Sequence, residues 1–128
     1  MQQRIINPSD GIFATTPDYV HGLEVTGATR QLYISGTVGL AEDGTAPDTL
    51  DAQLALIWHN IGRILRAGDM TENNIVRVTS DLTDRGQIEA NQDARLKALG
   101  GRAVPATAIV VQTLFDAWLV EVEVTAVA

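Results

Sequence analysis

The sequence predicts an α+β fold in which two helices pack on one face of a mixed β-sheet. Two segments are typical of helices: one repeats apolar residues at three- and four-residue spacings, and the other has a capping pattern at its start and two glycines at its end. Several shorter segments are rich in β-branched residues or alternate between apolar and polar side chains, as strands do. No linker or repeat interrupts the 128 residues, so we expect a single domain over residues 1–128.

The first predicted elements are strands. A short strand is expected at residues 4–6, and longer strands at residues 20–26 and 31–36. The sequence Gly27-Ala28-Thr29-Arg30 separates the two longer strands and suits the connection of a β-hairpin. We therefore expect these two strands to pair with each other.

Helices are predicted over residues 50–65 and 86–99. The first has an apolar face, whereas the inward face of the second is only partly apolar, so we expect the second to pack at an edge. Residues that suit the helix ends are Asp48 and Gly68 for the first helix, and Asp84 with Gln87 and Gly100-Gly101 for the second.

Three more strands are predicted, at residues 74–83, 106–114 and 118–127. The last strand alternates, with Val120, Val122 and Val124 on one face and Glu121 and Glu123 on the other. Two helices cover only one face of such a five- or six-stranded sheet. The other face would expose an apolar patch, so we expect the chain to self-associate through it.

Composition excludes several kinds of chemistry. The chain has no cysteine, which excludes disulfides, thiolate metal sites and a cysteine nucleophile. The net charge of −7 opposes binding to nucleic acid, because such binding needs cationic contacts to phosphates. Lys97 is the one lysine and hence the one candidate for a Schiff base. Without an apolar span or a signal-peptide pattern, we expect a soluble cytoplasmic protein.

The strongest candidate for chemistry is the pair Glu121 and Glu123. Two carboxylates at positions i and i+2 of a strand point the same way, and their repulsion raises the pKa of one of them. A raised pKa suits a general acid or base near neutral pH. The alternative is that both side chains lie on a solvated edge of the sheet and have no chemical role.

Other polar residues give weaker signals. His21 and His59 have no partner at metal-ligand spacing, so we expect no metal site and a surface position for His59. The stretch of residues 35–39, with two glycines, could form a nest of backbone N–H groups that binds a small carboxylate.

Four stretches of the sequence, in this order and spacing, resemble the RidA/YjgF family over nearly the whole chain. They are Ser35-Gly36, residues 74–84 with the Asp81-Leu82-Thr83-Asp84 turn, Pro105-Ala106-Thr107-Ala108, and the terminal Val-Glu-Val-Glu strand at residues 120–123. The resemblance implies a chorismate-mutase-like α+β fold, also called YjgF-like, and a homotrimer with clefts between its subunits. It also implies hydrolysis of enamines and imines, such as 2-aminoacrylate, to a ketoacid and ammonia, with no cofactor.

The resemblance assigns residues to this cleft. Glu121 matches the carboxylate that positions the attacking water. The substrate-binding residues that match are Tyr19, Ser35, Gly36 and Asn91, with Thr107 at the position where active members have an arginine that grips the substrate carboxylate. This chain therefore resembles a branch of the family that lacks the arginine, and Arg102 is the nearest candidate to replace it.

Two functions remain open at this point. One is a small-molecule hydrolase or deaminase that uses Glu121 as its catalytic residue. The alternative is a non-catalytic trimer that binds a metabolite or a protein partner in the same cleft. A third label used for the family, endoribonuclease, is opposed by the acidic charge.

Overall fold

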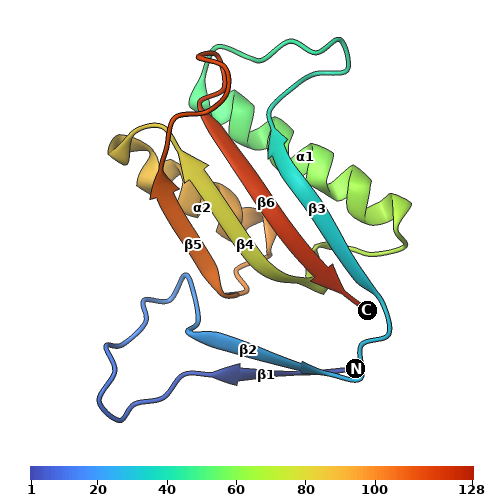
Figure 1. Cartoon of the computed structure of the whole chain (residues 1–128), viewed down its shortest axis with the longest axis vertical. Helices are drawn as coiled ribbons and strands as arrows, with labels where there is room; N and C mark the ends of the chain where they lie inside the picture. Colours follow the sequence, from blue (N-terminus) through green and yellow to red (C-terminus); the bar gives the residue numbers. More distant parts are fainter.

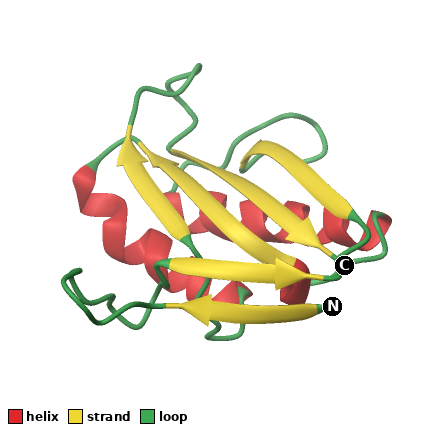
Figure 2. Ribbon diagram, turned by 60° about the horizontal axis from the view of Figure 1, so that its bottom comes forward, coloured by secondary structure: helices red, strands yellow, loops and turns green.

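A computed structural model describes all residues, 1–128, and consists of a four-stranded sheet backed by two helices, with a separate two-stranded sheet. Both helices lie on the same face of the larger sheet (Figures 1 and 2). Its strand order is β3 (Gln31–Val38), β6 (Val120–Val127), β4 (Ile75–Leu82) and β5 (Ala106–Val110). The β4–β5 pair is parallel and the other two are antiparallel, so the sheet is mixed, as predicted, but it has four strands rather than five or six.

Strand β2 (Gly22–Thr26) pairs with β1 (Gln2–Ile6), not with β3. The predicted hairpin is therefore wrong, although the short N-terminal strand is confirmed. Residues 27–30 instead carry the chain from the two-stranded sheet to the larger one (Figure 1). The backbone N–H groups of Thr29 and Arg30 bond the carbonyl of Ala128, so the connection is anchored at the C-terminal end of β6.

Helix α1 (Leu50–Ala67) begins at Thr49, whose hydroxyl accepts a hydrogen bond from the backbone N–H of Ala52. Asp48, the predicted cap, lies one residue too early. Gly68 does end the helix, but with a φ of −93°. The left-handed conformation expected there is adopted by the next residue, Asp69, with a φ of 55°.

Helix α2 (Ile88–Ala98) follows a short 3₁₀ helix, Arg85–Gln87. The predicted capping box is confirmed, because Asp84 and Gln87 bond each other's backbone N–H groups at the start of that turn. Gly100 and Gly101 have φ values of 63° and 83°, which any other residue would adopt only with strain. A second 3₁₀ helix, Glu72–Asn74, precedes β4.

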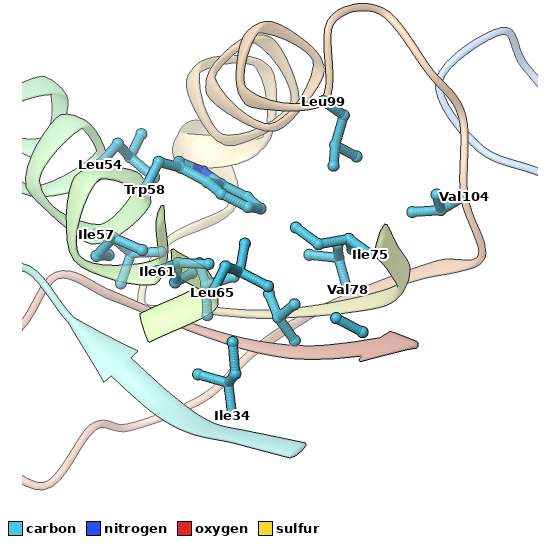
Figure 3. Close-up of a cluster of buried hydrophobic side chains, with 14 of the residues drawn as sticks. Ile34, Leu54, Ile57, Trp58, Ile61, Leu65, Ile75, Val78, Leu99 and Val104 are labelled. Atoms are coloured by element: carbon cyan, nitrogen blue, oxygen red, sulfur yellow. The ribbon is translucent and has the colours of Figure 1, made fainter. Parts of the chain in front are cut away.

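The core lies between the helices and the larger sheet, where side chains of both layers interdigitate (Figure 3). Helix α1 contributes most to it, with Leu54, Ile57, Trp58, Ile61 and Leu65 all buried. The sheet contributes the apolar face of β6, namely Val120, Val122, Val124 and Ala126, which confirms the predicted alternation. Burial of each such side chain stabilises the fold by about 1.5–3 kcal/mol.

Strands β5 and β6 are shorter than predicted because residues 111–119 form a loop. Gln53, a buried side chain of α1, holds this loop in place. Its amide donates to the carbonyls of Pro47 and Ala117 and accepts a hydrogen bond from the N–H of Leu119. The side chain thus has a partner for each polar atom, which offsets the cost of burying it.

No element covers the second face of the larger sheet (Figure 2). Two apolar side chains on it are largely exposed, Tyr33 at 72% and Ile109 at 51%. The face is more polar than expected, however, because Arg77, Asp81 and Glu123 lie on it as well. We call it the open face.

Candidate functional site

Glu121 lies on the open face, on the inner strand β6 and close to the N-terminal end of that strand. Its register partner on β4 is Asp81, and Glu123 lies two residues further along the same strand. Burial raises the pKa of the Glu121 carboxyl, and the nearby charges of Asp81 and Glu123 raise it further. The expected perturbation of one carboxyl by the other is therefore confirmed, and Asp81 is an additional cause that the alternation within β6 does not reveal.

The carboxylate of Glu121 lies directly over Gly36 of the neighbouring strand β3. A Cβ atom added to Gly36 would lie 2.9 Å from Cδ of Glu121 and closer still to Oε1, so only glycine leaves room for the carboxylate. The strand has a register shift between Ile34 and Thr37, which places Ser35 and Gly36 in a bulge. We call Ser35, Gly36, Asp81 and Glu121 the carboxylate cluster.

The predicted backbone nest at residues 35–39 does not form. The stretch continues as strand β3 to Val38, and neither Gly36 nor Gly39 has a positive φ. A nest needs alternating right- and left-handed residues, which an extended strand lacks. What this segment offers is the bulge beside Glu121.

Substitution of Gly36 by alanine tests this close approach. The added methyl group should displace the Glu121 carboxylate and lower kcat/KM by about 10²-fold, because small misplacements of a reacting group have effects of that size. Stability should change by less than about 1 kcal/mol, since the carboxylate can turn toward solvent. Gly22→Ala is the matched control, because its methyl group would lie at an ordinary 3.4 Å from Cβ of Ile6. Equal activity of both variants would contradict the role of the bulge.

Thr107 lies on the open face at β5, beside Thr79 of β4. Its hydroxyl accepts a hydrogen bond of 3.2 Å from Nη2 of Arg77. Arg102, the residue considered as a replacement for the missing arginine, is engaged elsewhere. Its guanidinium donates to the backbone carbonyls of Glu72 and Ile75, and burial lowers its pKa. Arg102 therefore has a structural role at the start of β4.

Tyr19 forms an isolated bridge with Val104, three residues before Thr107. The neighbouring Asp18 accepts a hydrogen bond of 2.8 Å from buried Arg95 of α2, so the segment around Tyr19 is fixed to the helix layer. His21 packs edge-on against the rings of Phe13 and Tyr19. His21 thus helps to hold the N-terminal loop, whereas His59 is exposed on α1, as predicted.

Asn91 is not brought to the open face. It lies on α2, which packs on the helix-covered face of the sheet (Figure 1), and is only 2% exposed. Its Oδ1 atom is buried without a hydrogen-bond partner. Asn91 is on the inward face of the helix, and that position separates it from the other candidate residues.

Within one chain, the remaining candidate residues lie in two separate places, one at the carboxylate cluster and the other around Tyr19 and Thr107. Glu121, Asp81 and Ile109 lie in one row across three strands, and Thr107 lies two residues before Ile109 on β5. With strands about 4.8 Å apart and about 3.3 Å per residue, the Cα atoms of Thr107 and Glu121 are about 12 Å apart. The two side chains are therefore not neighbours within a single chain.

Comparison with known proteins identifies the family. A family model described as endoribonuclease L-PSP matches residues 12–128. The chain belongs to this family, which includes the Rid proteins. A comparison with curated proteins found no match.

Solved structures of Rid proteins share the fold. YyfB of Yersinia pestis, described as a protein of unknown function of the conserved Rid family, is 25% identical, with a TM-score of 0.86 and full coverage of both chains. RidA from the Antarctic bacterium Psychrobacter sp. PAMC 21119 is 22% identical, with a TM-score of 0.73 over 89% of this chain and 97% of its own. The α+β fold expected from the Rid resemblance is thus confirmed.

Two residues of this Rid protein's open face, Asp81 and Arg77, were not among the candidates. Both lie on β4, where Arg77, Thr79 and Asp81 alternate with buried residues. That alternation is visible in the sequence and places them on the same face. The sequence does not show which strands lie beside β4, however. The pairing of β4 with β6 brings Asp81 next to Glu121, and its pairing with β5 brings Arg77 next to Thr107.

No group of three or more His, Asp or Glu side chains is arranged to hold a metal ion. No helix has the length and apolar character needed to cross a membrane.

Proposed function

We propose that this protein hydrolyses enamines and imines to a carbonyl compound and ammonia. The observation that carries the proposal is the Glu121 carboxyl, which is partly buried over Gly36 and has a raised pKa. A raised pKa makes the carboxylate a better base for a water molecule than an exposed glutamate would be. The reaction needs no cofactor.

The proposed reaction proceeds by general base catalysis and then general acid catalysis. An enamine first tautomerises to the imine. Water attacks the carbon of the protonated imine while Glu121 takes one of its protons, which gives a neutral carbinolamine. The proton held by Glu121 then passes to the nitrogen, and the C–N bond breaks as the hydroxyl proton returns to Glu121, which releases the carbonyl compound and ammonia. Ser35 and Gly36 would orient the substrate beside the carboxylate.

We propose that the complete cleft lies between subunits of a homotrimer. Two features support this assembly. The open face is not covered by any element of the chain, and the distance of about 12 Å separates Glu121 from Thr107. A neighbouring subunit that packs on the open face would bring Tyr19 and Thr107 of one chain toward the carboxylate cluster of the next.

The family name includes endoribonuclease, but we do not propose RNA as a substrate. Each chain carries a net charge of −7, which repels the phosphate backbone. Neither His21 nor His59 lies beside Glu121 in the open face, so no histidine pairs with the carboxylate.

The deciding experiment is an imine hydrolysis assay on the natural protein and on Thr107→Arg. Imines are generated in the cuvette from amino acids by an amino-acid oxidase, and their disappearance is followed by trapping the remainder with semicarbazide. We expect turnover by the natural protein. Turnover by the Thr107→Arg variant alone, with both proteins trimeric by light scattering, would instead favour the non-catalytic binding module.

A further inference from the structure

A groove lies between α1 and α2, on the helix-covered side of the larger sheet. Its volume of about 750 Å³ is typical of sites for small molecules. Because both helices lie on one face of the sheet (Figure 2), the groove is separate from the open face and from Glu121. Its apolar lining consists of Leu54, Ala55 and Trp58 of α1 and Ala90, Ala94 and Ala98 of α2.

The groove exists because α2 presents small side chains to α1. Ala90, Ala94 and Ala98 are four residues apart and therefore lie in one line along α2. All three are half-buried, and a methyl group is too small to fill the space beside Leu54 and Trp58. The apolar part of a ligand can fill this space and remove these side chains from water.

Trp58 places a hydrogen-bond donor without a partner at this groove. The residue is only 8% exposed, and its Nε1 atom is buried with no acceptor in the chain. Figure 3 shows the indole between the two helices, with its nitrogen on the side of α2. Buried donors in folded proteins almost always have a partner, so this one favours a ligand that brings an oxygen acceptor.

The rim of the groove is acidic. Asp51 of α1 and Glu89 and Asp93 of α2 line it, and all three are exposed. None of them takes part in an ion pair of the chain, and Lys97 is the one cation among the lining residues. The excess of carboxylates attracts a cationic ligand and repels an anionic one.

We propose that this groove binds a small aromatic amine that carries a hydroxyl group. The ammonium group lies beside the carboxylates of the rim, and the ring packs against the alanines and the indole of Trp58. The hydroxyl oxygen accepts the hydrogen bond of Nε1. This site is independent of the proposed hydrolysis, because a subunit that packs on the open face leaves the groove exposed.

The first test is titration calorimetry with tyramine, which has the ring, the ammonium group and the hydroxyl. The matched probes are phenethylamine, which lacks the hydroxyl, and tyrosol, which lacks the amine. We expect each of them to bind about 2- to 10-fold more weakly than tyramine, since one hydrogen bond or one charge interaction is lost. Equal or tighter binding of either probe, or no binding of tyramine, would overturn the inference.

The hydrogen bond is tested by Trp58→Phe, which keeps an aromatic ring and removes the N–H group. This variant should bind tyramine no more tightly than phenethylamine, whereas Trp118→Phe, in the loop before β6, should keep the difference between the two probes. A preference for tyramine that survives in Trp58→Phe would show that Nε1 does not bind the hydroxyl.

Two further variants test whether tyramine occupies the groove. Glu89→Gln combined with Asp93→Asn should weaken its binding by about 3- to 20-fold. Glu42→Gln combined with Asp116→Asn changes the net charge equally in exposed loops and should leave binding unchanged. Ala94→Leu fills the groove and should abolish binding, with the circular dichroism spectrum and the molar mass by light scattering unchanged.

Two results would contradict this location. Loss of tyramine binding in Glu121→Gln, with binding intact in Ala94→Leu, would place the ligand on the open face. A lower molar mass of Ala94→Leu would show that a second copy of the chain occupies the groove.

Discussion

Replacing Glu121 with glutamine is expected to lower kcat/KM for imine hydrolysis by about 10²- to 10⁴-fold, the usual contribution of a general acid–base group. Glutamine has the size of glutamate and fits over Gly36, but its amide does not take a proton from water. The measurement is steady-state hydrolysis across the imine panel. Glu42→Gln, in the exposed loop after β3, is the matched control and should retain the natural rate.

The same substitution should leave the protein at least as stable as before. Burial, with Asp81 and Glu123, raises the pKa of Glu121 in the folded chain, so the ionised form is disfavoured there. Between the unfolded and folded pKa values the folded chain binds more protons, and stability falls as the pH rises through that window. Glu121→Gln removes this penalty, so its unfolding free energy at pH 7 should equal or exceed that of the natural protein. Full turnover by the variant would contradict a catalytic role.

Replacing Asp18 with alanine is expected to lower the free energy of unfolding by about 3–5 kcal/mol, because it leaves a buried guanidinium without its carboxylate. The side chain of Arg95 is only 5% exposed, and Nη2 lies 2.8 Å from Asp18 Oδ2. The measurement is urea unfolding at pH 7. Asp10→Ala, in the same N-terminal segment but exposed and without an ion pair, should change stability by less than about 0.5 kcal/mol.

The effect of Asp18→Ala should depend on pH. Burial raises the pKa of Asp18, but hydrogen bonds from Thr16 and Arg95 more than offset this and hold it below its ordinary value. Stability from a carboxyl with a lowered pKa is fully present above the unfolded value, about 3.9, and is lost as the pH falls through the folded value. The difference between Asp18→Ala and the natural protein should therefore shrink below about pH 4. A difference that is constant from pH 7 to pH 3 would show that Asp18 stabilises the fold in some other way.

Elements with a strong local pattern could be predicted from the sequence. The three- and four-residue spacing of Leu54, Ile57, Ile61 and Leu65 defines a buried helix face because those positions align on any α-helix. The capping box of Asp84 and Gln87 is likewise local, since both partners lie within one turn. Glu121 could be identified as a candidate because alternation in its strand places it opposite the buried valines.

Features that depend on which segments meet could not be predicted in this way. Residues 27–30 have a length and composition that suit a hairpin. Strand β2 nevertheless pairs with β1, which begins 20 residues before it in the chain. Asn91 has the polar character of a site residue, yet it faces the interior because of its position on α2. Gly68 ends its helix without the left-handed φ that glycine would permit.

The sequence by itself determined the fold class, the faces of α1 and β6, and Glu121 as the carboxylate most suited to chemistry, because all of these follow from periodicity within one element. Only the tertiary structure decided which side chains surround that carboxylate. Strand pairing sets Asp81 beside Glu121, the bulge of β3 opens the space at Gly36, and β5 lies next to β4 so that Arg77 meets Thr107. The physical reason is that contacts between strands depend on registers and neighbours distant in the chain, which local patterns do not specify.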